Sequence, residues 1–164
     1  MLVGVISDTH DNLPLIDKAI ERLNLEKVRL VLHAGDYASP FVVPRFKALN
    51  ARLIGVLGNN DGDHEQLKKQ FDASEHCELR GRFALVDAEG FRIALLHGDE
   101  IELLNALVGC GGFDAVVHGH THATTSNSGK TLVVNPGEIC GYLTGKPTLA
   151  LLNTSKREVR IVRI

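Results

Sequence analysis

Residues 28–36, V-R-L-V-L-H-A-G-D, form the stretch that decides the fold. A run of Val and Leu of this length is typical of a strand buried on both faces, as strands of a parallel sheet are. Gly35 allows the tight backbone turn that ends such a strand, and Asp36 follows it directly. Because open α/β sheets bind their ligands at the carboxyl ends of their strands, this pattern predicts that Asp36 lies in a functional site.

Three more apolar stretches end in polar side chains in the same way. Residues 2–7, 53–57 and 115–117 are followed by D-T-H, G-N-N-D and H-G-H-T-H. Parallel neighbours in one sheet bring such ends to the same edge. We therefore expect one carboxylate, Asp36, to lie among several side chains of the kinds that bind metals.

The first half of the chain alternates strands with helices. Helices are predicted at residues 13–24, 40–49 and 63–71, with the strands at residues 2–7, 28–36 and 53–57. Asn12 is a suitable N-cap for the first helix, and Pro14 fits its first turn. The alternation favours a parallel sheet with crossover helices.

The second half consists mostly of strands. A hairpin is predicted from strands at residues 83–87 and 91–96, with Ala88-Glu89-Gly90 as its turn and His97 directly after it. A helix at residues 100–108 follows, then strands at residues 115–117, 131–134, 149–153 and 159–164, and a turn at Ser128-Gly129-Lys130. Two sheets packed face to face, with helices outside, would bury all of these strands.

The length and composition limit the class of protein. A chain of 164 residues fits a single domain, 1–164, and a net charge of −2 provides no basic face for long nucleic acid. The chain starts directly with a predicted strand and has no apolar run near the roughly 18 residues that span a bilayer, so a cytoplasmic protein without a membrane partner is expected. Three widely spaced cysteines without a C-x-x-C motif favour neither a disulfide framework nor a structural zinc site.

Seven candidate metal ligands follow predicted strand ends. They are Asp8, His10, Asp36, Asn59, His97, His120 and His122. Each residue alone is a weak signal, but five separate segments all deliver oxygen or imidazole ligands, a mixture that suits manganese, iron, cobalt, nickel or zinc. Seven side chains are too many for one catalytic ion, so we expect two divalent ions that share Asp36. Paired ions of this kind clamp the attacking and leaving oxygens in phosphoryl transfer.

The same residues carry a resemblance to a known family. Five blocks resemble the ordered signature of the calcineurin-like metallophosphoesterases: Asp8-x-His10, Gly35-Asp36, Gly58-Asn59-x-Asp61, His97-Gly98 and Gly119-His120-Thr121-His122. The short chain and its Asn135-Pro136-Gly137 turn are most similar to the small microbial phosphodiesterase branch. The resemblance implies an α/β fold, a four-layer α/β/β/α sandwich of two mixed sheets flanked by helices.

The resemblance also implies roles for the ligands. Asp8, His10 and His122 would hold one metal ion, with manganese expected first, and Asn59, His97 and His120 the other. Asp36 would bridge the two ions. They would lower the pKa of a bridging water, and the resulting hydroxide would attack phosphorus in line.

The expected catalytic residues are Asp36, Asn59, Asn60 and His97. Many relatives carry a histidine directly after the Asn ligand, where it can protonate the leaving group, whereas this chain has Asn60. An amide can hydrogen-bond a phosphoryl oxygen but cannot act as a general acid near neutral pH. Asp61 is expected to orient its loop rather than to bind metal.

The predicted function is a phosphodiesterase that hydrolyses a small phosphodiester. The alternatives are a phosphomonoesterase and a non-catalytic scaffold like the subunit of this fold in the retromer complex, whose metal ligands are partly lost. The complete ligand set favours an enzyme. For His33 and His118, support of a ligand and simple packing both fit the sequence, whereas His64 and His76 are expected on the surface.

One predicted apolar cluster fits either a core face or an interaction surface. Phe41, Val42 and Phe46 on the predicted helix at residues 40–49 are expected to form an inward core face. The alternative is a surface that contacts a partner protein or another subunit of a homo-oligomer.

Overall fold

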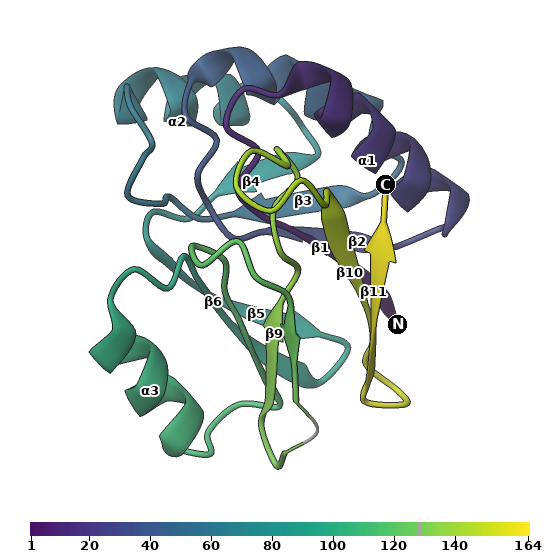
Figure 1. Cartoon of the computed structure of the whole chain (residues 1–164), viewed down its shortest axis with the longest axis vertical. Coiled ribbons are helices and arrows are strands. Elements are labelled where there is room, and N and C mark those ends of the chain that lie inside the picture. The colour runs from purple at the N-terminus through teal and green to yellow at the C-terminus, as the bar shows by residue number, and fades with distance from the viewer. Residues whose placement is uncertain (128) are drawn as a thin grey trace.

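Two β-sheets pack face to face in the computed structural model, which describes residues 1–127 and 129–164, with helices on the outer faces (Figure 1). The strand order is β11-β10-β1-β2-β3-β4 in one sheet and β5-β6-β7-β9-β8 in the other. This arrangement confirms the predicted four-layer α/β/β/α sandwich. Ser128 of the predicted turn at residues 128–130 lies outside the described residues.

The six-stranded sheet is mixed. Its strands are β1 (Leu2–Ile6), β2 (Leu30–His33), β3 (Arg52–Gly55), β4 (Cys77–Leu79), β10 (Thr148–Asn153) and β11 (Glu158–Arg163). The first four run parallel, which confirms the crossover pattern of the first half, whereas β10 pairs antiparallel with β1 and β11 with β10. The predicted strand at residues 28–36 is shorter in the structure, because the chain leaves the sheet after His33 to form the Asp36 loop.

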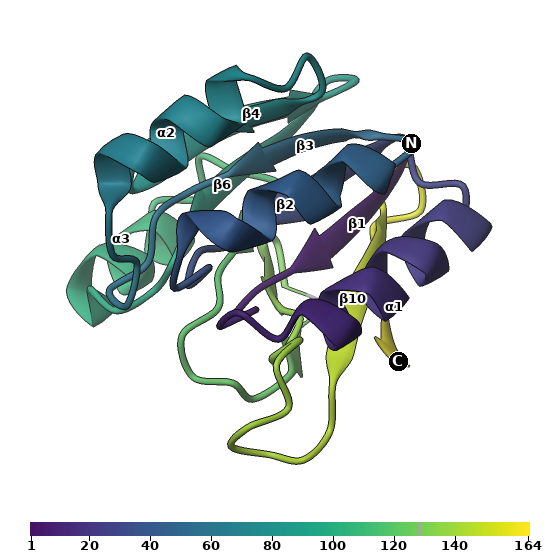
Figure 2. The same ribbon diagram turned by 90° about the horizontal axis from the view of Figure 1, so that it is seen from above.

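Three helices cover one face of this sheet, as the view from above shows (Figure 2). They are α1 (Leu13–Leu25), the 3₁₀ helix η1 (Pro40–Ala48) and α2 (His64–Asp72). Asn12 caps α1 as predicted, since its side chain accepts a hydrogen bond from Leu15 N. The helix predicted at residues 40–49 is present as a 3₁₀ helix, because Pro44 has no backbone N–H and in an α-helix its ring would clash with a carbonyl one turn earlier.

The apolar cluster on η1 divides between core and surface. Val42 and Phe46 are buried against the six-stranded sheet, which confirms the core face for these two residues. Phe41 is 80% exposed instead, because successive residues of a helix point about 100–120° apart, so position 41 does not share the inward face of its neighbour Val42.

The second sheet contains β5 (Phe83–Ala88), β6 (Phe91–Leu96), β7 (Ala115–Val117), β8 (Thr125–Ser126) and β9 (Leu132–Asn135). The predicted hairpin is present, but Ala88 pairs with Phe91, so its turn contains only Glu89 and Gly90. Both turn residues have positive φ, as two-residue hairpin turns require. The helix α3 (Ile101–Gly109) packs on the outer face of this sheet against Ala94, Leu96 and Val116.

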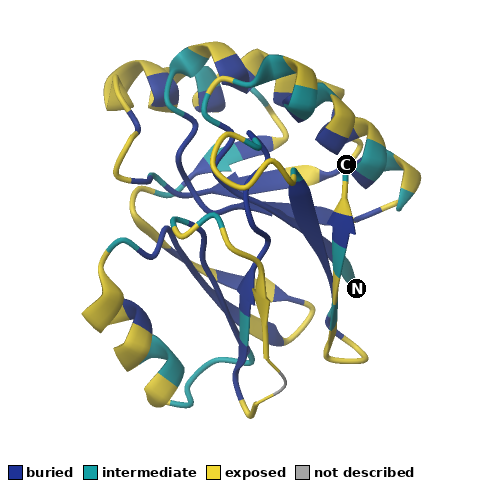
Figure 3. Cartoon of the chain, in the orientation of Figure 1, coloured by how far each residue is buried: buried dark blue, intermediate teal, exposed yellow. Residues whose placement is uncertain are grey.

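The core between the two sheets determines where the strand ends that carry the candidate site residues lie. Side chains of β1 and β2 meet those of β6 and β7 there, and the strands are mostly buried while the outer helical surfaces are exposed (Figure 3). The carboxyl ends of all four strands therefore open towards the same edge of the sandwich. None of the helices that the structure describes is long and apolar enough to cross a membrane.

Candidate metal centre

Strand register brings the ends of five strands to one level. Ile6 of β1 pairs with His33 of β2, and His33 pairs with Gly55 of β3. In the second sheet Leu95 of β6 pairs with Val117 of β7. The segments behind these strands carry the predicted ligands, so the register, and not the sequence distance, determines which side chains meet.

Two buried carboxylates form the centre of the site. Asp36 is 1% exposed; its Oδ2 lies 3.4 Å from His10 Nε2 and its Oδ1 lies 3.4 Å from His97 Nε2. Asp8 is fully buried, and its Oδ1 lies 3.3 Å from His122 Nε2 and 3.8 Å from His10 Nε2. The two oxygens of Asp36 thus face different histidines, as expected of a carboxylate that bridges two ions.

The two remaining candidate ligands, His120 and Asn59, differ in their contacts with the rest of the site. The backbone N of His120 donates to Asp8 Oδ2 at 3.2 Å, and its ring centroid lies 5.1 Å from that of His97. Asn59 lies in the turn after β3, but its side chain is exposed and makes no hydrogen bond within residues 1–127 and 129–164. The structure therefore brings together six of the predicted ligands: Asp8, His10, Asp36, His97, His120 and His122.

Buried polar atoms that lack a hydrogen-bond partner indicate whether these residues are suited to bind a metal ion. Asp8 Oδ1, His10 Nε2 and His97 Nε2 are buried without a hydrogen-bond partner in the part of the chain that the structure describes. Each such group costs about 1–3 kcal/mol unless something satisfies it. His97 Nδ1 donates to Ala34 O at 2.8 Å, which leaves the Nε2 lone pair directed at Asp36. These donors fit divalent cations of the borderline type.

The backbone is strained at the same positions. Five of the predicted ligands have φ between 37° and 67°: Asp8, His10, Asp36, His120 and His122. A residue other than glycine held in this left-handed region costs on the order of 1–3 kcal/mol, and such residues gather at functional sites. This backbone conformation therefore depends on the surrounding structure rather than on local preference.

Two glycines of the signature blocks allow the carboxylates to approach closely. A Cβ at Gly58 would lie 2.0 Å from Asp36 Oδ1, and a Cβ at Gly119 would lie 2.7 Å from Asp8 Oδ2 and 1.9 Å from Ser7 Oγ. No side chain larger than hydrogen fits at either position unless a carboxylate moves.

Asp61 holds the two loops that carry Asp36 and Asn59. Its carboxylate accepts backbone N–H groups from Tyr37 at 2.6 Å, Gly58 at 2.7 Å, Ala38 at 3.0 Å and Asp36 at 3.2 Å. Burial raises the pKa of Asp61 above its ordinary value, although the hydrogen bonds from Gly58, Ala38 and Tyr37 oppose the shift. These contacts confirm that Asp61 orients its loop.

His33 supports the site from within the core. It is fully buried; its Nδ1 accepts Gly35 N at 3.1 Å, and its Nε2 lies 3.2 Å from Thr9 Oγ1. Burial lowers its pKa to about 3, so the ring is neutral at physiological pH. Of the two roles left open, support fits His33, and His118 likewise contacts a ligand loop through Gly119 O at 3.1 Å. His64 and His76 are exposed, as expected.

Two buried residues of the site were missed. Asn135 donates its Nδ2 to Gly119 O at 2.8 Å and to Thr121 Oγ1 at 3.0 Å, so it fixes the loop between His118 and His122. Glu138 lies 2.6 Å from His122 Nδ1. The Asn-Pro-Gly turn marked this segment in the sequence, but nothing local indicated which strand end it would contact.

A known family matches most of the length of this chain. The calcineurin-like phosphoesterase superfamily domain matches residues 1–157. The chain belongs to this superfamily.

Two individual proteins of similar sequence give a more specific comparison than the superfamily. The chain is 42% identical over 161 residues to a phosphodiesterase from Methanocaldococcus jannaschii, covering 98% of this chain and 97% of that protein. A probable metallophosphoesterase from Methanothermobacter thermautotrophicus is 33% identical over 146 residues, 84% of this chain and 76% of that protein.

Solved structures agree in fold. An archaeal phosphodiesterase superposes with a TM-score of 0.95 at 41% identity, with 100% of both chains covered. Zinc-bound Vps29 from Entamoeba histolytica superposes with a TM-score of 0.71 at 23% identity, covering 100% of this chain and 98% of that one, which shows a common fold alone.

Proposed function

We propose that residues 1–164 act as one metallophosphoesterase domain that hydrolyses small phosphodiesters. The observation that carries this proposal is the pair of buried carboxylates, Asp8 and Asp36, whose oxygens lie 3.3–3.8 Å from three histidine Nε2 atoms. Buried carboxylates and imidazoles without hydrogen-bond partners are what a dinuclear centre would satisfy. The likeness to a phosphodiesterase from Methanocaldococcus jannaschii supports the substrate class.

In this proposal Asp8, His10 and His122 hold one divalent ion, Asn59, His97 and His120 hold the other, and Asp36 bridges them. When bound, two such ions supply an activated water near neutral pH and neutralise charge on the phosphoryl oxygens. Ala34 O and Glu138 hold the Nδ1 atoms of His97 and His122, so the Nε2 atoms of both rings face the carboxylates. Asp61 keeps the Asp36 and Asn59 loops together while the substrate binds.

The substrate class is tested with paired aryl substrates. Manganese-loaded protein is expected to hydrolyse an aryl phosphodiester at least about tenfold faster than the matching monoester, a difference of about 1.4 kcal/mol in barrier. A monoester carries an additional negative charge near neutral pH, and this site offers no cationic histidine at position 60 to neutralise it. Faster hydrolysis of the monoester would replace this proposal by the phosphomonoesterase alternative.

Asn60 makes the rate sensitive to the leaving group. Its backbone N and its Nδ2 lie 2.9 and 2.8 Å from the two oxygens of Asp36, so it contacts the centre without a transferable proton. Asn60→His is expected to raise hydrolysis of alkyl diesters by about 10²-fold, the lower end for a positioned general acid, and to change aryl diesters little. Rates across a series of leaving groups measure this effect.

Asn60→Gln is the matched control, because it enlarges the side chain without adding an acid. A wild-type rate that does not depend on the leaving-group pKa, when chemistry limits turnover, would place the general acid elsewhere. His64, whose Nε2 lies 3.0 Å from Asp61 O, and nearby water are the next candidates to test in that case.

The scaffold alternative has less support. A scaffold has no need of buried carboxylates and imidazoles without partners, and here Asp8, His10 and His97 all contribute such atoms. The Vps29 structures are similar in fold alone. Manganese as the native ion, a cytoplasmic location and a homo-oligomeric state remain predictions.

A further inference from the structure

Glu138 is a buried carboxylate that belongs to no predicted ligand position. It is 0% exposed and lies in the segment between β9 and β10. Ile139 N donates to Ser7 O at 3.0 Å and Cys140 N donates to Asp8 O at 3.0 Å, so this segment is fixed to the end of β1. The strand end that carries Asp8 therefore also positions Glu138.

Five donors converge on the two oxygens of Glu138. Oε2 accepts from His122 Nδ1 at 2.6 Å and Cys140 Sγ at 3.0 Å. Oε1 accepts from Thr144 N at 2.6 Å and Thr144 Oγ1 at 2.7 Å, and Leu143 N lies 3.2–3.3 Å from both oxygens. An ionised carboxylate offers acceptor lone pairs on both oxygens and no donor, so surroundings made of five donors are matched to this residue type.

The contact with Glu138 determines the tautomer of His122. Because the carboxylate can only accept, Nδ1 of His122 carries the proton and Nε2 presents its lone pair. Nε2 lies 3.3 Å from Asp8 Oδ1, on the side where the proposed ion would be held. A carboxylate behind a histidine in this way fixes the orientation of the ring and raises its basicity as a ligand.

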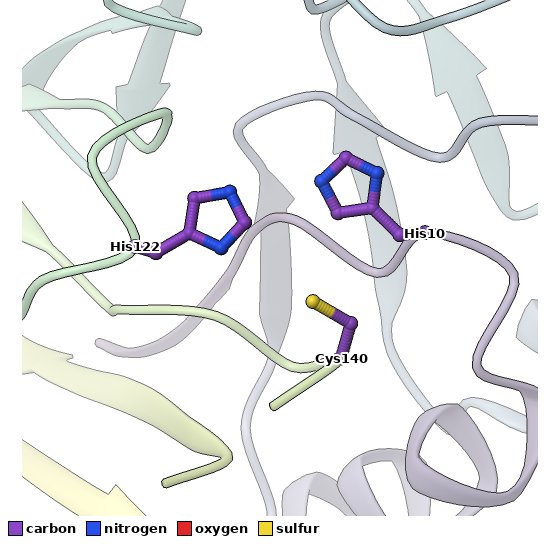
Figure 4. Close-up of side chains that lie close together, drawn as sticks. All are labelled: His10, His122 and Cys140. Atoms are coloured by element: carbon purple, nitrogen blue, oxygen red, sulfur yellow. The ribbon is translucent and has the colours of Figure 1, made fainter. Parts of the chain in front are cut away.

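Cys140 lies close to His10 and His122, which makes its thiol a candidate metal ligand. Its sulfur points towards the space between the rings of His10 and His122 (Figure 4), and one nitrogen of each ring lies within 4.8 Å of it. However, the thiol donates to Glu138, which contacts Nδ1 of His122, whereas the ion would face Nε2. The geometry therefore makes the thiol a donor to Glu138 rather than a metal ligand.

We infer that Glu138 is a positioning residue that holds His122 in the Nδ1–H tautomer and thereby strengthens metal binding by Asp8, His10, Asp36 and His122. The inference rests on the proposed function, because it takes these four residues as the ligands of one ion. It adds a residue between β9 and β10 on which the centre depends.

Glu138→Gln tests the inference with almost no change in side-chain size. One oxygen becomes an NH₂ group that faces N–H, O–H or S–H donors, so the hydrogen bond to His122 is weakened or lost. Calorimetric titration of the metal-stripped protein with manganese is expected to show a 10–100-fold weaker site. Glu158→Gln, an exposed position at the far end of β11, is the matched control and should bind manganese as the wild type does.

The imidazole nitrogen NMR spectrum of the metal-free protein provides a second measurement. Wild-type His122 is expected to be the Nδ1–H tautomer, and Glu138→Gln should shift it towards Nε2–H. A residue that merely stabilised the fold would lower the melting temperature without changing the tautomer. An Nε2–H tautomer in the wild type overturns the inference even if the variant does not fold.

The outcomes separate this inference from the proposed function. A wild-type protein that binds no manganese counts against the proposed function, while the tautomer still decides the role of Glu138. Unchanged affinity in Glu138→Gln, with manganese bound by the wild type, overturns the inference alone. Cys140→Ser keeps a donor to Glu138, so a loss of affinity as large as that of Glu138→Gln would make the sulfur a ligand and also overturn it.

Discussion

Asp36→Asn is expected to lose bound metal and phosphodiesterase activity together. Among residues 1–127 and 129–164, Asp36 is the one carboxylate whose two oxygens face different histidines, His97 and His10, each at 3.4 Å. The substitution removes the negative charge that would hold two cations close together and replaces one ligand oxygen by an NH₂ group. We expect the rate to fall by at least about 10³-fold, or about 4 kcal/mol, as determined from kcat/KM.

Metal content measured by mass spectrometry separates this effect from unfolding. The variant should retain clearly less than the two ions per chain proposed for the wild type. Asp114→Asn is the matched control: Asp114 lies at the opposite end of β7 and pairs with Arg157. Two ions and a nearly intact rate in Asp36→Asn would show that Asp36 is not the bridge.

Removal of the ions is expected to abolish hydrolysis completely. The predicted catalytic residues include no nucleophilic Ser, Thr or Cys, so in the proposed mechanism bound metal activates the attacking water. Dialysis against a chelator should therefore stop turnover of an aryl phosphodiester. Manganese or a neighbouring transition ion should restore it, with activity rising until about two equivalents per chain are bound.

A control measurement checks that the fold is unchanged after chelation. Far-ultraviolet circular dichroism of the stripped protein should match that of the loaded protein, because the two sheets and their core do not depend on the site. Full turnover in stripped protein would contradict metal dependence and with it the dinuclear proposal.

Two strands of the second sheet were predicted to the residue. The strands at residues 91–96 and 115–117 match β6 and β7, because each mostly buried apolar stretch ends directly before a histidine, although Arg92 within β6 is exposed. Strands without such a stretch were missed. Cys77–Leu79 is a three-residue edge strand, and Thr125–Ser126 is exposed and contains no apolar residue.

The sequence by itself determined the α/β class and the ligand types. Both depend on neighbours along the chain: apolar runs that predict buried strands, and an Asp, Asn or His that follows each run within a few residues. Six predicted ligands accordingly meet at one edge, although they come from four different strand ends.

Only the tertiary structure decided how the ligands are held. The three N–H groups that the Asp36 loop donates to Asp61, the carboxylate of Glu138 behind His122 and the placement of β10 beside β1 all join residues that are distant in sequence. The left-handed backbone at five ligands is unfavourable for those residue types, so no local preference predicts it. It persists because the packing of two sheets and the hydrogen bonds of the surrounding loops outweigh the local cost.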